Sequence, residues 1–403
     1  MNEAAGSEFR QWIFLDSRVI CLVKKIICFL LTVAVVAPVL MYRVPAVYAE
    51  PGVSAGSAIL IEADTGRVLY EKNAHDRRSM ASTTKIMTAM LVLESEELDR
   101  VVEITQEMVQ VEGSSMGLQA GDQVTLETLA YGILLESGND AANAAAITLG
   151  GSVEGFVEMM NQRAVALGLK DTHFVTPSGL DAEEHYTTAY DLALLGAAAM
   201  RLPQFAEVAS QSSAKVNFVN PPTVRTLYNH NRLLKELEGC DGVKTGFTKK
   251  SGRCLVTSCQ RDGVHLIAVT LNAPDDWDDH KAMMEYGFSK TESVHLDAAD
   301  FEVQIPVVGG AEGQTVRAVP SGSTDITLLK GEKEQLEMKV EADRFLYAPV
   351  SEGRVAGRIV YRLEGKEVAE IPLVTSEEAP YVEPKLNFFQ RLWRDICRLF
   401  GRY

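Results

Sequence analysis

The stretch Ala81–Lys85 constrains the fold of this 403-residue chain more than any other feature. It lies between a basic turn, Asp76–Arg78, and the apolar run Ile86–Leu93, whose composition predicts a helix. Ser82 is a residue type that begins helices, so Ser82 and Lys85 should lie one turn apart on one face. A lysine can take the proton of a serine hydroxyl only if its pKa falls from about 10.4 toward neutrality. Burial and the positive end of a helix both lower that pKa, so the stretch predicts a serine activated by a lysine.

Alone, the Ser-x-x-Lys pattern is weak evidence for this chemistry. A second copy occurs at Ser212–Lys215, and a helix cap beside a solvated lysine explains either copy without catalysis. The interpretation of Ser82 therefore depends on the other segments of the chain.

Length and composition indicate an ordinary globular protein. The chain is long enough for two domains with separate cores, and 46% of its residues are hydrophobic and 23% charged. The formal net charge is -16, although residues 1–49 and 385–403 are each net basic. So acidic a body argues against nucleic acid as a partner.

The amino-terminal residues 1–49 are predicted to be a secretory signal peptide. A lysine pair precedes the apolar run Ile26–Leu40, and Val47–Ala49 offers small residues where a signal peptidase would cut. An uncleaved membrane anchor is the alternative, although the run is short and Pro38 interrupts it. With either interpretation we expect the body of the protein outside the cytoplasm.

The six cysteines fit no metal-ligand spacing, and we expect neither a metal nor another cofactor. Cys254 and Cys259 are five residues apart on a predicted strand, so they should point to opposite faces and cannot easily pair with each other. A bridge from Cys240 to one of them is the alternative to free, partly buried thiols.

Hydrophobic periodicity and turn residues predict both strands and helices in the first two thirds of the chain. We expect a hairpin with strands at 57–62 and 67–71, helices at 126–136, 140–149, 153–167 and 188–200, and paired strands at 252–260 and 264–271. His185 has no acidic partner at useful spacing, so we interpret it as a hydrogen-bonded structural histidine.

Two further segments carry residues suited to chemistry. In Ser137–Asn139 the ordinary interpretation is a helix C-cap followed by an N-cap, and the functional one is a hydroxyl and an amide that project above Ser82. In Lys244–Gly246, on a probable edge strand, the glycine would let another backbone approach. Lys244 and Thr245 would then suit a carboxylate, unless the segment is only an exposed strand end with a solvated lysine.

The remaining chain changes character. Residues 291–382 contain short alternating stretches with glycine turns, which predict a small all-β sandwich that serves as a spacer or docking module. In residues 383–403, apolar side chains that include Phe389 and Trp393 fall on one helical face and arginines on or beside the other. This pattern is typical of a helix in a membrane interface, although packing against the β domain would also bury the apolar face.

Taken in this order, Ser82–Lys85, Ser137–Asn139 and Lys244–Gly246 resemble the three motifs of penicillin-binding proteins and serine β-lactamases. The flanking residues make the chain similar to the low-molecular-weight D-alanyl-D-alanine carboxypeptidases of peptidase family S11. These flanking residues are Ala81, Glu136, Asp140–Ala141 and Asp241–Val243.

The resemblance covers nearly the whole mature chain and implies its architecture. It implies an α/β (α+β) serine β-lactamase/transpeptidase-like domain at 50–290, with an antiparallel sheet and a helical subdomain. The small all-β sandwich at 291–382 and the amphipathic membrane-anchoring helix at 383–403 would follow.

The resemblance also implies roles for individual residues. Ser82 would be the acylated nucleophile, Lys85 its base, and Ser137 the relay that passes the proton to the departing D-alanine. The others would bind substrate: Asn139 the peptide amide, Lys244 and Thr245 the terminal carboxylate, and Gly246 and Phe247 the backbone beside it. The N–H groups of Ser82 and Phe247 would form an oxyanion hole, a contribution of roughly 3 to 4 kcal/mol per donor.

Two departures from the family pattern affect substrate contacts. Phe247 stands where some relatives carry His, which retains a backbone donor but no side-chain role. His230 stands where relatives carry Arg, and Arg232 is then a candidate for the missing charge.

The expected substrate is the D-Ala-D-Ala end of a peptidoglycan pentapeptide stem, and β-lactams are the expected covalent inhibitors. The enzyme is expected at the outer face of the bacterial cytoplasmic membrane. A secreted β-lactamase is the first alternative, with Glu183 and Glu184 the only loop carboxylates to consider for deacylation. A non-catalytic peptidoglycan-binding or penicillin-sensing protein is the second, which an intact Ser82, Lys85 and Lys244 disfavour.

Overall fold

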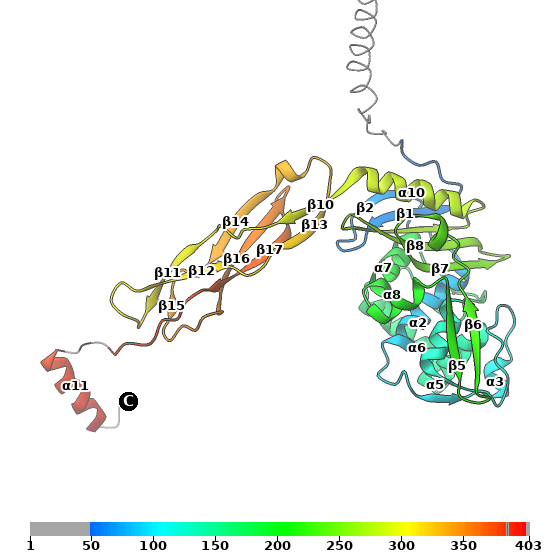
Figure 1. The fold of residues 1–403 in the computed structure, drawn as a ribbon, viewed down its shortest axis with the longest axis horizontal. Helices are drawn as coiled ribbons and strands as arrows, with labels where there is room; N and C mark the ends of the chain where they lie inside the picture. Colours follow the sequence, from blue (N-terminus) through cyan, green and yellow to red (C-terminus); the bar gives the residue numbers. More distant parts are fainter. Residues whose placement is uncertain (1–48, 384, 386, 400–403) are drawn as a thin grey trace, which may run out of the picture. The chain divides into compact units, whose positions relative to one another are not determined.

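The computed structural model describes residues 49–383, 385 and 387–399 (Figure 1). The predicted signal peptide, with Cys21 and Cys28, lies outside these residues except for its last position. The chain first forms a mixed α/β domain and then an all-β domain, in agreement with the expected fold class.

An antiparallel five-stranded sheet with strand order β2-β1-β9-β8-β7 organises the first domain. The predicted hairpin is confirmed as β1 (Ser57–Glu62) and β2 (Val68–Lys72), and the later pair as β8 (Gly252–Arg261) and β9 (Val264–Leu271). β7 (Cys240–Thr248) pairs with β8 and forms the edge of the sheet, as its motif predicted.

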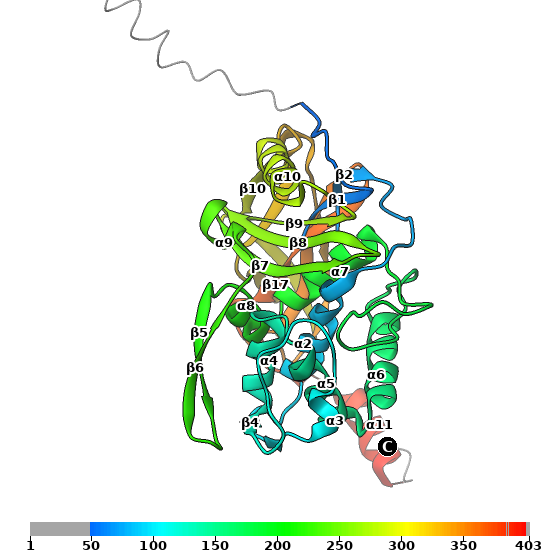
Figure 2. The same ribbon diagram turned by 90° about the vertical axis from the view of Figure 1, so that its right-hand side faces the viewer.

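Helices cover both faces of this sheet (Figure 2). Alternate residues of one strand point to opposite faces, so Ile59 and Ile61 of β1 pack in one core and Ala58 and Leu60 in the other. The helices of this domain are α2 (Lys85–Leu93), α3 (Gln106–Val109), α4 (Leu126–Leu134), α5 (Asn139–Gly150), α6 (Val153–Ala166), α7 (Ala189–Met200), α8 (Pro203–Ala209), α9 (Leu233–Glu236) and α10 (Asp276–Lys290).

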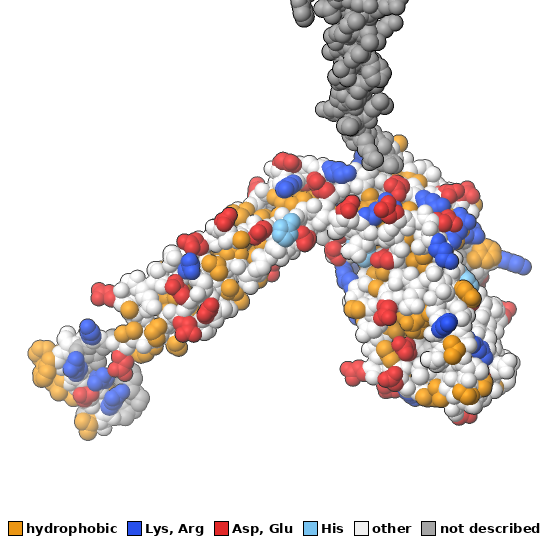
Figure 3. Space-filling model, viewed as in Figure 1, with side chains coloured by type: hydrophobic (Ala, Val, Ile, Leu, Met, Phe, Trp, Pro, Cys, Tyr) orange, Lys and Arg blue, Asp and Glu red, His pale blue; other side chains and the backbone are white. Residues whose placement is uncertain are grey.

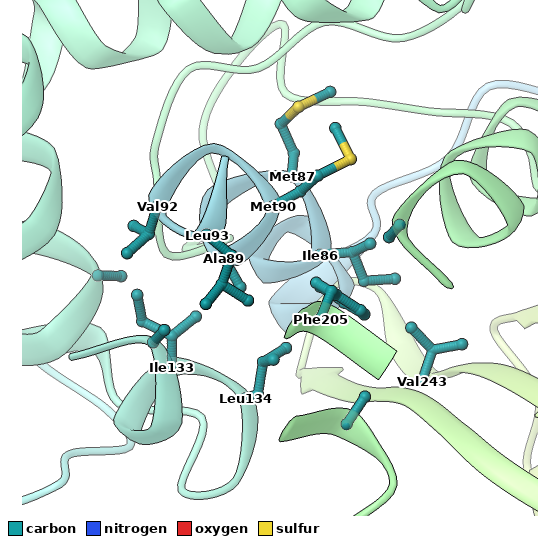
Figure 4. Close-up of a cluster of buried hydrophobic side chains, with 14 of the residues drawn as sticks. Ile86, Met87, Ala89, Met90, Val92, Leu93, Ile133, Leu134, Phe205 and Val243 are labelled. Carbon is teal, nitrogen blue, oxygen red and sulfur yellow. The ribbon is translucent and has the colours of Figure 1, made fainter. Parts of the chain in front are cut away.

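The central helix α2 is buried on nearly every side, so its sequence is apolar rather than amphipathic. Its side chains pack against Ile133 and Leu134 of α4, Phe205 of α8 and Val243 of β7 (Figure 4). This packing fixes the start of α2, where Lys85 lies directly after the turn that contains Ser82.

Several elements of the described chain have no counterpart in the expectations from sequence, among them the short helices α3, α8 and α9. Another is α10, which covers the second face of the sheet with Met283 and Met284 but has few apolar residues. The hairpin of β5 (Ser213–Phe218) and β6 (Thr223–Tyr228) was not expected either. Two short strands, β3 (Val101–Glu103) and β4 (Gln123–Thr125), pair beside the helices.

The second domain is all β, as predicted. Its main sheet has six strands in the order β14-β16-β17-β12-β11-β15, and β10 pairs with β13. Its core is separate from the two cores of the first domain and includes Val316, Ile359 and Leu373. The strands are β10 (Thr291–Leu296), β11 (Val303–Val308), β12 (Thr315–Pro320), β13 (Thr324–Leu329), β14 (Glu337–Ala342), β15 (Leu346–Tyr347), β16 (Val355–Leu363) and β17 (Lys366–Thr375).

The last described element is α11 (Phe388–Leu399). Phe388, Phe389 and Trp393 are exposed on it, and apolar and basic side chains both reach its surface (Figure 3). Leu386, Phe400 and Arg402, which the predicted amphipathic pattern includes, lie outside the described residues. Within the described chain, none of the helices has the length and apolar character required to span a bilayer.

Candidate active site

Ser82 lies in a short 3₁₀ turn, Ala81–Thr84, immediately before α2. It does not cap α2, because its side chain makes no hydrogen bond to the first turn. Its hydroxyl oxygen instead lies 3.1 Å from Nζ of Lys85, the first residue of α2. The turn therefore presents the hydroxyl to the amine on the next turn of the chain.

Lys85 is completely buried and its amine has three oxygen neighbours. Besides Ser82, Nζ contacts Oδ1 of Asn139 at 2.7 Å and the carbonyl oxygen of Ser178 at 2.6 Å. Burial lowers the pKa of Lys85 well below its ordinary value, and the charge of Lys244 lowers it further, against a weaker opposing effect of Asp140. The structure thus favours the neutral amine beside Ser82.

The carbonyl of Ser178 reaches Lys85 because Gly179 permits a close approach of two loops. Gly179 has φ +84°, and a Cβ there would lie 2.0 Å from the carbonyl oxygen of Ala81. The sequence gives no local sign of this carbonyl contact.

The second segment stands at the start of α5. Ser137 has φ 57°, Gly138 caps the helix, and Asn139 is its first residue. The Asn139 amide nitrogen donates to the carbonyl oxygen of Glu112 at 2.6 Å, which leaves its Oδ1 directed at Lys85. The Asn139 side chain therefore connects the backbone at Glu112 to the amine of Lys85.

Asp140, next to this segment, holds the loop 114–118 over the site. Its carboxylate accepts hydrogen bonds from the hydroxyl of Ser115 and the backbone N–H groups of Met116 and Leu118. These bonds fix the loop that brings Ser114 to the site.

The third segment lies on the edge strand β7. Lys244 is 1% exposed, and burial lowers its pKa to about 7. Gly246 faces the turn that carries Ser82: a Cβ there would lie 3.0 Å from the backbone nitrogens of both Ser82 and Thr83. The glycine therefore allows β7 to lie against the turn, as expected from the sequence.

These segments border one cleft of about 300 Å³. Five predicted positions line it, whereas Lys85, Asn139 and Lys244 lie buried behind its surface. The predicted lining residues are Ser82, Ser137, Thr245, Gly246 and Phe247, and the cleft is completed by Ser114, His230, Arg253, Asp276 and Trp277.

Four of the lining residues, Ser114, Arg253, Asp276 and Trp277, were not anticipated. Arg253 pairs with Phe247 across the β7–β8 ladder. Knowledge of this strand register would have placed Arg253 beside the cleft. Asp276 and Trp277 begin α10, which the sequence did not predict, and Ser114 depends on the loop contacts of Asp140.

The basic residues of the segment 229–234 take different positions. His230 lines the cleft, and its pKa is lowered by burial and then by Lys244, against the opposing charge of Glu136. Arg232 does not line it; its guanidinium lies 4.9 Å from the Trp277 ring centroid and 3.5 Å from Glu236.

His185 has the structural role expected for it. Its Nδ1 accepts from the backbone N–H of Val175 at 2.9 Å, so Nε2 donates to the Thr84 hydroxyl at 2.8 Å. Burial lowers the pKa of His185 to about 4, which keeps the ring neutral and the loop joined to the turn that carries Ser82.

No group of three or more His, Cys, Asp or Glu in the described part of the chain is arranged to hold a metal ion. Cys240, Cys254, Cys259 and Cys397 are free thiols, and Cys254 and Cys259 lie in different cores, as their spacing predicted.

Two family models match the chain. Residues 45–275 match the D-alanyl-D-alanine carboxypeptidase family, peptidase family S11, and residues 292–381 match the C-terminal domain of penicillin-binding protein 5. The two matches fall on the mixed α/β domain and on the all-β domain.

Individual relatives cover most of the chain. D-alanyl-D-alanine carboxypeptidase DacF of Bacillus subtilis (strain 168) is 33% identical over 339 residues, which are 80% of this chain and 85% of the relative. DacA of Escherichia coli (strain K12) is 32% identical over 370 residues, with 88% and 89% covered. The crystal structure of penicillin-binding protein 5 from Haemophilus influenzae is 30% identical, with a TM-score of 0.65 over 82% of this chain and 99% of that chain.

Proposed function

The chain belongs to the peptidase S11 family of D-alanyl-D-alanine carboxypeptidases, and from this premise we propose that Ser82 is the residue that it acylates. Enzymes of this family remove the terminal D-alanine from peptidoglycan stems outside the cytoplasm through an acyl-serine intermediate, and they bind β-lactams. The chain is accordingly a serine-type D-Ala-D-Ala carboxypeptidase.

The observation that carries the assignment is the set of oxygens around the Lys85 amine. A neutral amine has two N–H donors and one lone pair, and two carbonyl oxygens, from Asn139 and Ser178, lie at 2.7 and 2.6 Å from it. If both N–H groups donate to them, the lone pair remains for the Ser82 hydroxyl at 3.1 Å. Lys85 can then accept the hydroxyl proton while the serine oxygen attacks the carbonyl carbon of the D-Ala-D-Ala bond.

We assign the other residues the roles that the family resemblance implies. Backbone N–H groups of Ser82 and Phe247 stabilise the oxyanion, and Asn139 binds the substrate amide. Ser137 passes the proton taken by Lys85 to the leaving D-alanine nitrogen, and Thr245 with Lys244 binds the terminal carboxylate. Gly246 supports this by letting β7 lie against the turn of Ser82. Water then hydrolyses the ester and regenerates the Ser82 hydroxyl.

Covalent labelling tests the nucleophile. We expect purified protein to release D-alanine from a pentapeptide, and a β-lactam to remain attached to the tryptic peptide that contains Ser82. An adduct on another serine would refute the assignment of Ser82. Rapid turnover of the β-lactam would support the β-lactamase alternative, and neither release nor labelling would support a non-catalytic binding protein.

We also assign the chain four parts, with the signal peptide at 1–49, the catalytic domain at 50–290, the β domain at 291–382 and a membrane-anchoring helix at 383–403. The anchor is supported by α11, on which Phe389, Trp393 and Leu399 are exposed and arginines are available for anionic lipid headgroups. It would hold the enzyme at the outer face of the cytoplasmic membrane.

Deletion of residues 386–403 tests the anchor. The truncated protein should move from the membrane to the soluble fraction and retain its D-alanine release. A matched full-length variant, Phe389→Glu with Trp393→Glu, should do the same, because it keeps the length of the tail but removes its apolar face. Unchanged membrane fractionation of both proteins would contradict the anchor.

A further inference from the structure

We infer that Arg253 is the permanently charged group that selects substrates with a free carboxylate at the carboxyl terminus. This inference rests on the proposed function, because it assigns a residue to substrate recognition in the same cleft. Arg253 takes the role for which the sequence suggested Arg232 as a candidate.

Arg253 is correctly placed for that role. It is the second residue of β8 and pairs with Phe247, two residues beyond Thr245 on the neighbouring strand. Both Arg253 and Thr245 line the cleft. A carboxylate bound at the Thr245 hydroxyl would therefore have a guanidinium on the same side of the cleft.

Two neighbours hold the Arg253 side chain in position. Its Nε donates to Oδ1 of Asp276 at 2.8 Å, and its guanidinium carbon lies 5.5 Å from the centre of the Trp277 ring. The Asp276 side chain is only 3% exposed, whereas that of Arg253 is 42% exposed. Within the described residues, the two terminal NH₂ groups of Arg253 have no hydrogen-bonded protein acceptor, so both can donate to a carboxylate.

Arg253 is needed because the other basic groups at the cleft have lowered pKa values and do not keep a positive charge at neutral pH and above. Lys85 must be neutral to act as the base, and burial brings the pKa of Lys244 to about 7. His230 is the other basic residue in the cleft lining, and burial also lowers its pKa. A guanidinium keeps its charge at every physiological pH, so Arg253 supplies a positive charge that does not depend on these groups.

The test compares two peptides with purified full-length protein, an N-acylated L-Lys-D-Ala-D-Ala and the same peptide with a C-terminal carboxamide. Arg253→Ala should lower kcat/KM for the free acid by about 10- to 100-fold, the range for a lost hydrogen bond to a charged group, and should lower it much less for the amide. Arg253→Lys should recover only part of the loss, because lysine cannot bind a carboxylate through two parallel donors.

Arg261→Ala is the matched control. Arg261 also lies on β8 and also stands over an aromatic ring, that of Phe288, but it does not line the cleft. Its loss should leave the ratio of acid to amide cleavage unchanged. An unchanged ratio in Arg253→Ala would overturn the inference. Failure of the unsubstituted protein to cleave either peptide would instead contradict the proposed function.

A different observation, on two cysteines, carries a second inference. We propose that Cys240 and Cys259 form a disulfide that joins β7 to β8 four residues before Lys244. The two residues are direct partners in the ladder. The N–H of Gln260 donates to the carbonyl of Gly239, and the N–H of Cys240 donates to that of Leu237, so the cysteines occupy a pair without mutual hydrogen bonds.

In an antiparallel ladder, residue pairs without mutual hydrogen bonds are those at which the two strands lie closest together. Their Cα atoms lie about 4.5 Å apart, inside the range of about 4.4 to 6.8 Å that a disulfide spans. The two thiols influence each other: the Cys259 thiol lowers the pKa of Cys240, and the Cys240 thiol together with burial raises that of Cys259. Cys240 is also the more exposed of the two, so it is the thiol that an oxidant meets first.

A dissolved disulfide such as oxidised glutathione can complete the reaction. The Cys240 thiolate attacks it, forms a mixed disulfide and releases one glutathione thiolate. Cys259 then loses its proton and attacks the Cys240 sulfur, and the second glutathione leaves as a thiolate. Two cysteine thiols are oxidised and one glutathione disulfide is reduced to two thiols.

Peptide mapping after equilibration with oxidised and reduced glutathione tests this inference. The unsubstituted protein and Cys254→Ser should each contain a bridge between the peptides of Cys240 and Cys259, and Cys259→Ser should not. The bridge should also raise the Tm relative to the reduced protein. Alkylation of both Cys240 and Cys259 after oxidation, or a bridge that includes Cys254, would overturn the proposal.

Discussion

The two Ser-x-x-Lys sequences of this chain have opposite structural outcomes. Ser82 and Lys85 lie on successive turns of a helical segment, with the lysine buried and its amine 3.1 Å from the hydroxyl. Lys215 lies in β5, and it is exposed. Ser212 lies immediately before β5, and an extended strand carries Lys215 away from it, whereas a helical turn would bring the two residues together.

This difference shows that a Ser-x-x-Lys sequence can pair a lysine base with a serine only where the segment is helical and the lysine is buried. The first copy is enclosed by segments from α5, from the loop at Ser178 and from β7, which exclude water from the amine. The second copy belongs to a hairpin of two strands and has no such enclosure. The same substitution made in each copy therefore tests whether catalysis requires the helical, buried setting or only the Ser-x-x-Lys pattern.

The largest expected effect is at the serine. Ser82→Ala should reduce D-alanine release by about 10⁴-fold or more, because no hydroxyl remains for Lys85 to activate. Ser212→Ala should retain full activity. A steady-state assay of both variants with one pentapeptide measures the difference, and comparable losses in the two would contradict the assignment of Ser82.

The next effect is at the lysine. Lys85→Met should lower the acylation rate by about 10³-fold, the size expected for loss of a general base. Its Tm should fall by only a small amount, because methionine fills a similar space but leaves the oxygens of Asn139 and Ser178 without their donor. Lys215→Met should change neither quantity. Acylation by a fluorescent penicillin and thermal unfolding give the two measurements, and a large fall in Tm for Lys85→Met would indicate a structural role instead.

A smaller effect is expected from the close approach of β7 to the first copy. In Gly246→Ala, the new Cβ would press on the backbone nitrogens of Ser82 and Thr83 at 3.0 Å and move β7 away from the turn. Acylation should slow by about 10- to 100-fold, because small displacements from a reactive geometry are costly. Gly52→Ala is the control, since its Cβ would meet no atom within 4 Å. Equal acylation rates for both variants would show that this approach is not needed.

The smallest effect is a change in pH dependence. The pKa of Lys85 is well below its ordinary value and that of Lys244 is about 7. Therefore kcat/KM should rise as Lys85 loses its proton and fall as the pH passes through about 7 and Lys244 loses its charge. Lys244→Arg should remove the falling limb, because arginine stays charged. Lys215→Arg should leave the profile unchanged, and a falling limb that persists in Lys244→Arg would assign it to another group.

The sequence predicted the elements with strong local patterns. The β1–β2 and β8–β9 hairpins, the helices that became α4 to α7 and the strands after Thr291 follow from periodicity and turn residues. The helix α10 was not expected, because it has few apolar residues. The β5–β6 hairpin, which contains the exposed Lys215 of the second Ser-x-x-Lys copy, was not expected either. Their stability depends on packing rather than on local preference.

By itself, the sequence determined which three segments to examine, their order and the family they resemble, because each motif is short and continuous. Only the tertiary structure decided which lysine is buried and which residues complete the cleft. The environment of Lys85 comes from Asn139 and Ser178, and that of Arg253 from Asp276 and Trp277, all distant in sequence. A pKa and a cleft are set by what surrounds a group in space, and a linear pattern does not contain those neighbours.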